Sequence, residues 1–297
     1  AAPTLLPGGR LVADPEARAE VERAWGVTLP SQPGRDTTGI LAAAAAGQLD
    51  GLVIGGVDPA DLPDPRLAEQ ALSRARFVVS LEMRPSAVTK AADVVLPIAS
   101  TVEKAGSYLD WEGRRREFAT TITATTAGAG ATLPDCRVLD SLAIEMDVDL
   151  FTQTPAAAWG GFAALGRYSG ADGALRGESP QVTAAPVAQV SDGQALLATW
   201  RRLLDNGSMQ DGEPHLAGTA RPAVALLSEA TATELGVHIG GKVTVSTTQG
   251  SVTLPVAAAD LPAGVVWIPG NSGPATVRSG LGAGHGAVVT VRGGNGR

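Results

Sequence analysis

The chain has 297 residues, which corresponds to about two domains if one domain takes roughly 150 residues. Hydrophobic residues make up 44% and charged residues 18%, so the composition is typical of a folded globular protein and not of a disordered one. The net charge of −7 argues against a nucleic acid or an anionic membrane as the main binding partner.

Cysteine and histidine usage narrows the possible metal sites. Cys136 is the only cysteine, so an internal disulfide is excluded, and an iron–sulfur cluster with about four thiolate ligands cannot be built from these residues alone. His215, His238 and His285 lie far apart in the sequence, so we expect no zinc site. Residues 1–11 lack an initiator Met and a secretory signal pattern, which we interpret as a fragment or a processed product.

The first half of the chain alternates predicted helices and strands. Helices are predicted at residues 15–25, 37–46, 65–75 and 86–91. Short apolar runs, which are typical of buried parallel strands, occupy residues 51–56, 77–81 and 94–96. This alternation indicates an α/β domain with a parallel sheet, and we expect it to be Rossmann-like.

The pattern changes in the middle of the chain. Residues 103–118 predict a hairpin or an extended excursion, and the Thr-, Ala- and Gly-rich residues 120–132 predict a loop. Asp135 is the expected cap of a helix with one apolar face, formed by Val138, Leu139, Leu142 and Met146. We expect residues 167–192 to be a mobile linker, followed by a helix that begins at Asp192, carries Leu196, Leu197, Trp200, Leu203 and Leu204, and ends at Asn206-Gly207.

From residue 223 onward, the apolar residues recur with a period of two. Strands are predicted at 243–247, 252–256, 265–268 and 288–291, with a turn at Gln249-Gly250 and one helix at 228–235. Several short strands in about 75 residues favour a small closed β-barrel. The predicted domains are therefore 1–165, the α/β domain; 166–218, a linker and helix; and 219–297, the barrel.

Short catalytic motifs are weak in this sequence. Residues 282–287 match G-x-G-x-x-A, but they precede a strand, so a barrel turn explains them better than a phosphate site. Glu103, Asp110 and Glu112 are conceivable acid–base groups, although a solvated loop is the simpler interpretation. Arg114, Arg115 and Arg116 more often form surface ion pairs than an anion site. No G-x-S-x-G elbow is present.

One longer pattern is specific. Residues 80–97 have the sequence SLEMRPSAVTKAADVVLP, and residues 103–114 have the sequence EKAGSYLDWEGR. Their order and spacing resemble the molybdopterin oxidoreductase superfamily, and residues 228–292 resemble its last domain, a double-psi barrel. Asp110-Trp111 stands where catalytic members more usually carry Asn-Thr, and with the helix at 137–147 it narrows the resemblance to the G-subunit family of NADH-quinone oxidoreductase (respiratory complex I).

The resemblance implies a function and a setting. The chain would be a non-catalytic scaffold portion of a subunit that transfers electrons from NADH through iron–sulfur clusters to quinone, coupled to proton translocation. The clusters would lie in a missing N-terminal half, and the partners would be other peripheral-arm subunits. The chain would lie on the cytoplasmic side of the bacterial plasma membrane, peripheral to it, with no bilayer insertion and no nucleic acid.

The resemblance also implies what the segment lacks. We expect no catalytic residue, no metal and no cofactor here, and a vestigial cleft with Trp111 in the space that a pterin takes in catalytic relatives. The candidate cleft residues are Gly55, Gly56, Thr89, Asp93, Trp111, Arg114, Asn271 and Ser272. The alternative is a fragment of a molybdenum–pterin oxidoreductase such as a formate dehydrogenase-like enzyme, and a free-standing nucleotide-binding module is a weaker third possibility.

Overall fold

The computed structural model describes residues 3–110, 112–122, 132–166, 168 and 188–294. The chain divides into two compact units: one comprises Ala1–Val57 and Gln70–Gln181, and the other comprises Asp58–Glu69 and Val182–Arg297. The sequence placed residues 58–69 in the first domain, whereas their contacts join them to the second unit. Among the described residues, no helix is both long enough and apolar enough to cross a membrane.

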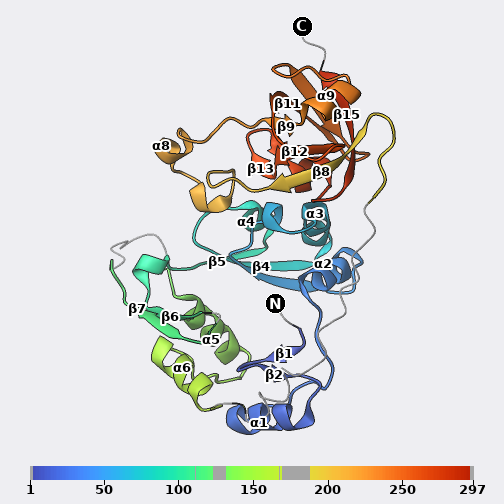
Figure 1. Cartoon of the computed structure of the whole chain (residues 1–297). Coiled ribbons are helices and arrows are strands. Elements are labelled where there is room, and N and C mark those ends of the chain that lie inside the picture. Colours follow the sequence, from blue (N-terminus) through green and yellow to red (C-terminus); the bar gives the residue numbers. More distant parts are fainter. Residues whose placement is uncertain (1–2, 111, 123–131, 167, 169–187, 295–297) are drawn as a thin grey trace. The chain divides into compact units, whose positions relative to one another are not determined.

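The first unit contains a three-stranded parallel sheet in the order β3-β4-β5, drawn in blue and cyan in Figure 1. Its elements up to the sheet's last strand are β1 (Leu5–Leu6), β2 (Arg10–Leu11), α1 (Pro15–Trp25), α2 (Thr37–Ala45), β3 (Gly51–Gly55), α3 (Pro65–Arg74), β4 (Phe77–Glu82), α4 (Ala87–Ala91) and β5 (Val94–Pro97), with α3 crossing the division between the units. The predicted helices and strands of this region are confirmed. Asp14 caps α1 through its side chain, and Gly26 closes it with a left-handed φ of 65°, as the Asp-Pro start and the glycine stop indicated.

The sheet is less buried than the sequence predicted. On one face, Leu52 packs with Ala44 of α2 and Ala71 of α3. On the other face, Leu81 packs with Ile98 and Val138. Val53 and Phe77 nevertheless remain 65% and 50% exposed, and Val94 and Val95 of β5 are 37% and 42% exposed. The prediction of buried strands is therefore wrong for β3, for the start of β4 and for β5. Apolar runs predict a strand correctly but do not show which part of the protein covers it.

A buried arginine joins the start of the chain to a distant segment of the same unit. Arg10 on β2 is fully buried and forms an ion pair with Glu20 of α1, with the guanidinium Nε 2.8 Å from a carboxylate oxygen. Its Nη2 donates to the carbonyl of Leu165 at 2.7 Å. Its guanidinium also lies over the ring of Tyr168. Because an unpaired buried charge is costly, these contacts hold Leu165 and Tyr168 against the N-terminal segment.

The excursion at 103–118 is a hairpin of β6 (Gly106–Leu109) and β7 (Arg115–Phe118). It is followed by α5 (Asp135–Glu145) and α6 (Pro155–Ala163). Asp135 lies inside the first turn of α5 and pairs with Lys104, while Pro134 occupies the cap position, so the predicted Asp135 cap is wrong. α6 was not predicted, although Thr154-Pro155 is a regular helix start and the Thr154 hydroxyl accepts from the amide of Ala157.

The second unit is a closed six-stranded barrel in the order β10-β11-β9-β12-β8-β15. Its elements are β8 (Gln194–Trp200), α8 (Pro214–Ala217), β9 (Ala225–Leu227), α9 (Glu229–Glu234), β10 (Lys242–Ser246), β11 (Ser251–Ala258), β12 (Val265–Pro269), β13 (Asn271–Ser272), β14 (Ala275–Thr276), α10 (Val277–Leu281) and β15 (Val288–Gly294). Alternate side chains fill the interior, among them Val243 and Val245 of β10 and Leu254 of β11. The predicted barrel and the helix capped by Ser228 are confirmed.

The prediction of a helix after Asp192 is wrong. Residues 194–200 form β8, drawn in yellow in Figure 1, which pairs in parallel with β12 and antiparallel with β15. Ala195 and Leu197 point into the barrel, whereas Trp200 and Leu203 are 75% and 94% exposed. A short apolar run fits both a helix and a strand, and here the ladders on both sides decide for the strand. Most of the predicted mobile segment, 167–192, lies outside the described residues.

Candidate functional site

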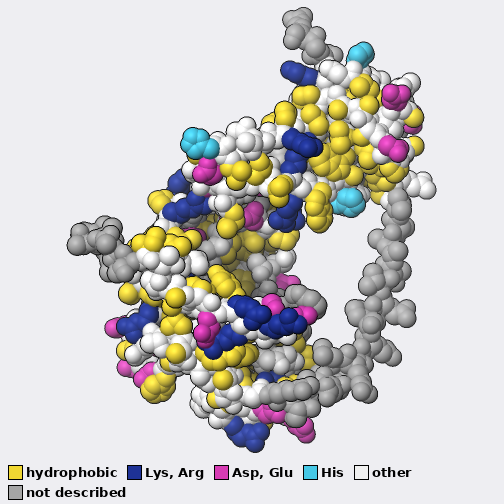
Figure 2. All heavy atoms as spheres, turned by 60° about the vertical axis from the view of Figure 1, so that its left-hand side comes forward, with side chains coloured by type: hydrophobic (Ala, Val, Ile, Leu, Met, Phe, Trp, Pro, Cys, Tyr) yellow, Lys and Arg dark blue, Asp and Glu magenta, His cyan; other side chains and the backbone are white. Residues whose placement is uncertain are grey.

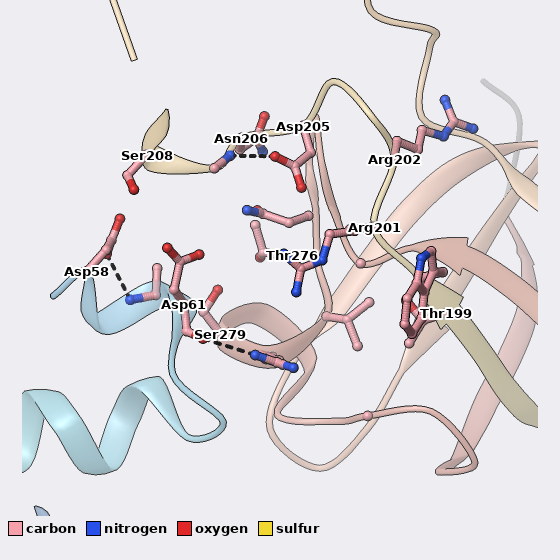
Figure 3. A pocket seen from close by; sticks show the side chains of 18 of the residues that line it. Asp58, Asp61, Thr199, Arg201, Arg202, Asp205, Asn206, Ser208, Thr276 and Ser279 are labelled. Carbon is pink, nitrogen blue, oxygen red and sulfur yellow. Dashed lines mark hydrogen bonds between the residues drawn. The ribbon is translucent and has the colours of Figure 1, made fainter. Parts of the chain in front are cut away.

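A cavity of about 750 Å³ lies in the second unit (Figure 3). Its walls come from the end of β8 and the following loop to Gln210, from the β12–β13 corner, from the start of α10, and from the loop before β15. The short 3₁₀ turn Pro59–Asp61 completes the lining. Two hydrogen bonds hold this region to the barrel: Arg66 donates to the carbonyl of Gln249 at 2.8 Å, and Arg278 donates to that of Asp61 at 3.0 Å.

Three carboxylates line the cavity. Asp58 caps the 3₁₀ turn by accepting from the amide of Ala60 at 2.9 Å, and Asp205 accepts from the amide of Gly207 at 2.8 Å. Figure 3 shows the carboxylates of Asp61 and Asp205 pointing into the same space. Among the described residues, none of these three groups forms an ion pair. The acidic side of the cavity therefore keeps free acceptor oxygens.

The cationic groups of the lining are differently oriented. The guanidinium of Arg201 extends into the cavity, whereas that of Arg202 turns away from it (Figure 3). Arg202 donates to the carbonyls of Arg221 and Pro222 at 2.9 and 2.6 Å and lies over the ring of Trp267. With Arg278 bonded to a carbonyl, Arg201 is the cation of this lining that has no hydrogen-bond partner among the described residues.

A buried hydroxyl adds to the polar lining. Thr199 lies at the end of β8, and its Oγ1 is buried without a hydrogen-bond partner among the described atoms. Its backbone amide donates to Nδ1 of His285 at 3.4 Å. Since Nδ1 accepts, the imidazole presents its other nitrogen as a donor. The cavity therefore offers donors and acceptors from five separate segments.

Sequence reasoning identified one residue of this cavity. Asn271 of β13 lines it, and the neighbouring Ser272 is buried with an unpartnered hydroxyl. Asp58, Asp61, Arg201, Asp205 and Arg278 were not predicted, because their segments are far apart in sequence and carry no motif. The Asp58-Pro59 pair, which follows Gly56 and Val57 after the end of β3, was an available signal of a cap.

The other candidate cleft residues belong to the first unit, where the described contacts are structural. Thr89 forms a reciprocal capping box with Ser86 at the start of α4. Asp93 accepts from the amide of Val78 at 2.7 Å and thereby joins β4 to the start of β5. Gly55 ends β3, and Gly56 turns the chain with a φ of 62°, for which glycine is suited.

The hairpin candidates lie at its exposed turn. Arg114 pairs with Glu112 at 2.7 Å, and its amide donates to a carboxylate oxygen of Asp110 at 2.8 Å. Arg115 pairs with Glu117 and stacks over the ring of Trp159. Trp111, and with it the prediction that it fills a pterin space, lies outside the described residues. Within those residues, no group of three or more His, Cys, Asp or Glu side chains is arranged to hold a metal ion.

Two family models match the chain. Residues 11–132 match the molybdopterin oxidoreductase model, and residues 196–296 match the molydopterin dinucleotide binding domain. The structure is similar to that of acetylene hydratase from Pelobacter acetylenicus, with a TM-score of 0.51, 18% identity, and coverage of 85% of this chain and 42% of that chain. This likeness shows the fold: a mixed α/β molybdopterin-oxidoreductase fold with a parallel sheet and a closed barrel.

The cavity does not fit a pterin dinucleotide. The diphosphate of such a ligand carries negative charge, which needs several converging cations or amide donors. The lining carries three arginines against three carboxylates, but Arg202 turns away from the cavity and Arg278 is bonded to the carbonyl of Asp61. Arg201 is therefore the guanidinium of this lining that is left to face a diphosphate, which is short of several converging donors.

Several similar curated proteins are described as the G subunit of NADH-quinone oxidoreductase. The chain is 49% identical to the protein of that description from Mycobacterium bovis over 99% of its length, and 44% identical to the one from Streptomyces coelicolor over 98%. These matches cover 36% and 34% of the relatives, so the chain spans about a third of their length. The predicted resemblance is thus confirmed, and the chain belongs to the G-subunit family of NADH-quinone oxidoreductase, within the molybdopterin oxidoreductase superfamily.

Proposed function

We propose that this chain is a non-catalytic scaffold portion of the G subunit of NADH-quinone oxidoreductase. The observation that carries this proposal is the 44–49% identity to proteins of that name along nearly the whole chain. Its relatives' name implies electron transfer from NADH to a quinone, and we assign that redox chemistry to other parts of the enzyme. In this proposal, iron–sulfur clusters lie elsewhere in the subunit, and the partners are other peripheral-arm subunits on the cytoplasmic side of the membrane.

The described contacts support a scaffold role. The residues that sequence reasoning considered for a cofactor cleft act within the first unit as a helix cap, a strand anchor and a surface ion pair: Thr89, Asp93 and Arg114. Of the arginines that line the cavity, Arg201 is the one left to face a diphosphate, so we propose that the segment binds no pterin, no metal and no cluster of its own. We further propose that the sheet domain is Rossmann-like and that the barrel is of the double-psi type.

The test uses the assembled enzyme with substitutions in this chain. Leu254, which is 1% exposed in the barrel interior, is replaced by Asp, and we expect loss of the G subunit from the assembled complex. The matched cavity variant Arg201→Gln should assemble normally and retain NADH-quinone activity within about twofold of wild type. A large loss of activity by Arg201→Gln in a fully assembled enzyme would contradict the scaffold proposal.

The cofactor prediction has its own measurement. Elemental analysis and denaturing mass spectrometry of the purified 297-residue chain should find neither stoichiometric molybdenum or iron nor a released pterin nucleotide. A stoichiometric pterin nucleotide would favour the alternative, a segment of a molybdenum–pterin oxidoreductase.

A further inference from the structure

The end of α5 and the segment after it expose an unusual number of hydrophobic side chains. We call this set the α5 patch, and it consists of Leu139, Leu142, Met146, Val148, Leu150 and Phe151. Met146 and Phe151 are 76% and 75% exposed. Hydrophobic side chains reach the surface at several places in Figure 2, and single exposed residues are normal. Within the thirteen positions 139–151, however, seven large hydrophobic side chains are exposed, these six and Ile144, and such a density needs an explanation.

The patch follows the helix geometry. Leu139, Leu142 and Met146 have the spacing i, i+3 and i+7, so they form one stripe along α5. The sequence predicted this stripe as a core face. In the structure, Val138 of the predicted face is buried, and it packs in a cluster with Leu81 and Ile98. The rest of the stripe therefore has the composition of a core face without a cover among the described residues.

The segment after α5 is held in place by hydrogen bonds. The amide of Asp147 donates to the carbonyl of Ile144 and that of Val148 to the carbonyl of Ala143, which closes α5 as a Schellman motif with Asp147 in a left-handed conformation (φ 61°). Further on, Asp140, which is 1% exposed, accepts from both the amide and the hydroxyl of Thr152 at 2.9 and 3.1 Å.

These bonds fix the position of Phe151. Thr152 is hydrogen-bonded to Asp140 in the second turn of α5. The preceding residue, Phe151, is therefore held close to that helix. Phe151 itself has a φ of 53°, which is rare for an aromatic residue, and its amide donates to the Asp149 side chain at 2.8 Å. An aromatic side chain held outward at a conformational cost is preorganised for burial by another surface.

We propose that the α5 patch is buried permanently by the portion of the G subunit that lies outside these 297 residues. This inference rests on the proposed function, because it requires that the chain be part of a longer G subunit. The relatives are almost three times as long as the segment that they share with this chain, so ample polypeptide remains to supply the cover. A patch this apolar resembles an obligate interface, which stays covered after folding.

The charges around the patch define the surface that covers it. Glu145, Asp147 and Asp149 alternate with the apolar residues at its end. The covering surface should therefore be apolar at its centre and carry Lys or Arg at its rim, since like charges across an interface are unfavourable.

The test measures methionine oxidation in the full-length G subunit, purified without the other subunits. The 297 residues contain three methionines, Met83, Met146 and Met209. The subunit is treated briefly with dilute hydrogen peroxide, and sulfoxide formation is read by peptide mass spectrometry against the same protein unfolded in guanidinium. We expect Met146 to be oxidised at least tenfold more slowly than in the unfolded protein. Met209, which is 97% exposed on the other unit, serves as the internal reference for an open site.

The outcomes separate the possible covers. Oxidation of Met146 at the unfolded rate in the full-length subunit would overturn the proposal. If Met146 oxidation is slowed only when light scattering detects a dimer, a second copy of the subunit covers the patch. If Met146 oxidation is slowed only in the assembled enzyme, another subunit covers it. Either result also overturns the proposal. None of these readouts depends on NADH-quinone activity, so a failure here is distinct from a failure of the proposed function.

A pair of variants tests the patch directly. Phe151→Lys in the full-length subunit should speed the oxidation of Met146 at least threefold, because a cation in the patch loosens its cover. Leu203→Lys changes a residue of the second unit that is 94% exposed, and it should leave the Met146 rate unchanged. Equal Met146 rates in the two variants would contradict the assignment.

Discussion

The Leu197→Ala substitution, compared with a control, distinguishes a strand from a helix as the structure of residues 194–200. Leu197 is 1% exposed inside the barrel, on a strand that pairs with both β12 and β15. Shortening Leu to Ala removes three carbon atoms, worth about 2.4 kcal/mol of transfer free energy at ~0.8 kcal/mol each. A residual cavity adds to this, so we expect the free energy of unfolding to fall by about 3 to 4 kcal/mol.

The control is Leu203→Ala. In a helix from Asp192, residues 196, 200 and 203 would share the buried stripe, so Leu203 would also matter. In the structure it is 94% exposed, and we expect a change within about 0.5 kcal/mol. The assay is urea denaturation followed by hydrogen exchange of the β8 and β12 peptides, which reports on the barrel separately from the first unit. A Leu203→Ala effect as large as that of Leu197→Ala, or a Leu197→Ala effect below about 1 kcal/mol, would refute the reasoning.

Two further predictions concern ionisation and backbone space. The hydrogen bond between Tyr168 and Asp14 raises the pKa of Tyr168 from 10.0 to about 12 and lowers the pKa of Asp14 from 3.8. The contribution of Tyr168 to stability is therefore complete below pH 10 and is lost as the pH rises toward 12. The contribution of Asp14 is lost as the pH falls below 3.8. In Tyr108→Phe, which leaves Tyr168 as the only tyrosine, ultraviolet titration should show a midpoint well above 10; a midpoint near 10 would contradict the assigned bond. Gly250→Ala places a Cβ 2.0 Å from the carbonyl oxygen of Gly280 and should destabilise the barrel by about 1–3 kcal/mol in urea denaturation, whereas Gly284→Ala meets no atom within 4 Å and should be nearly neutral.

Local signals predicted most of the first unit and much of the barrel. Asp14 and Gly26 bound α1 by side-chain capping and a left-handed φ, both of which depend on residues close in sequence. The alternation of Val243 and Val245 with polar residues likewise reflects the pleat of a single strand. Such signals depend on residues close in sequence, so they can be recognised without knowing the rest of the fold.

Long-range contacts account for the failures. Residues 194–200 are a strand because β12 and β15 flank them, and those partners lie about 70 to 90 positions away in sequence. The cavity brings together Asp61 and Arg201, which lie 140 positions apart in the sequence. No pattern within a window of about 15 residues carries that information.

The amino-acid sequence by itself determined the α/β character, the barrel, the caps and turns, and the family. It also determined that α5 has an apolar stripe. Only the tertiary structure decided that Leu139, Leu142 and Met146 of that stripe face outward and that three carboxylates share a cavity with Arg201. The physical reason is that periodicity identifies a face that requires burial, whereas burial depends on which distant surface meets that face.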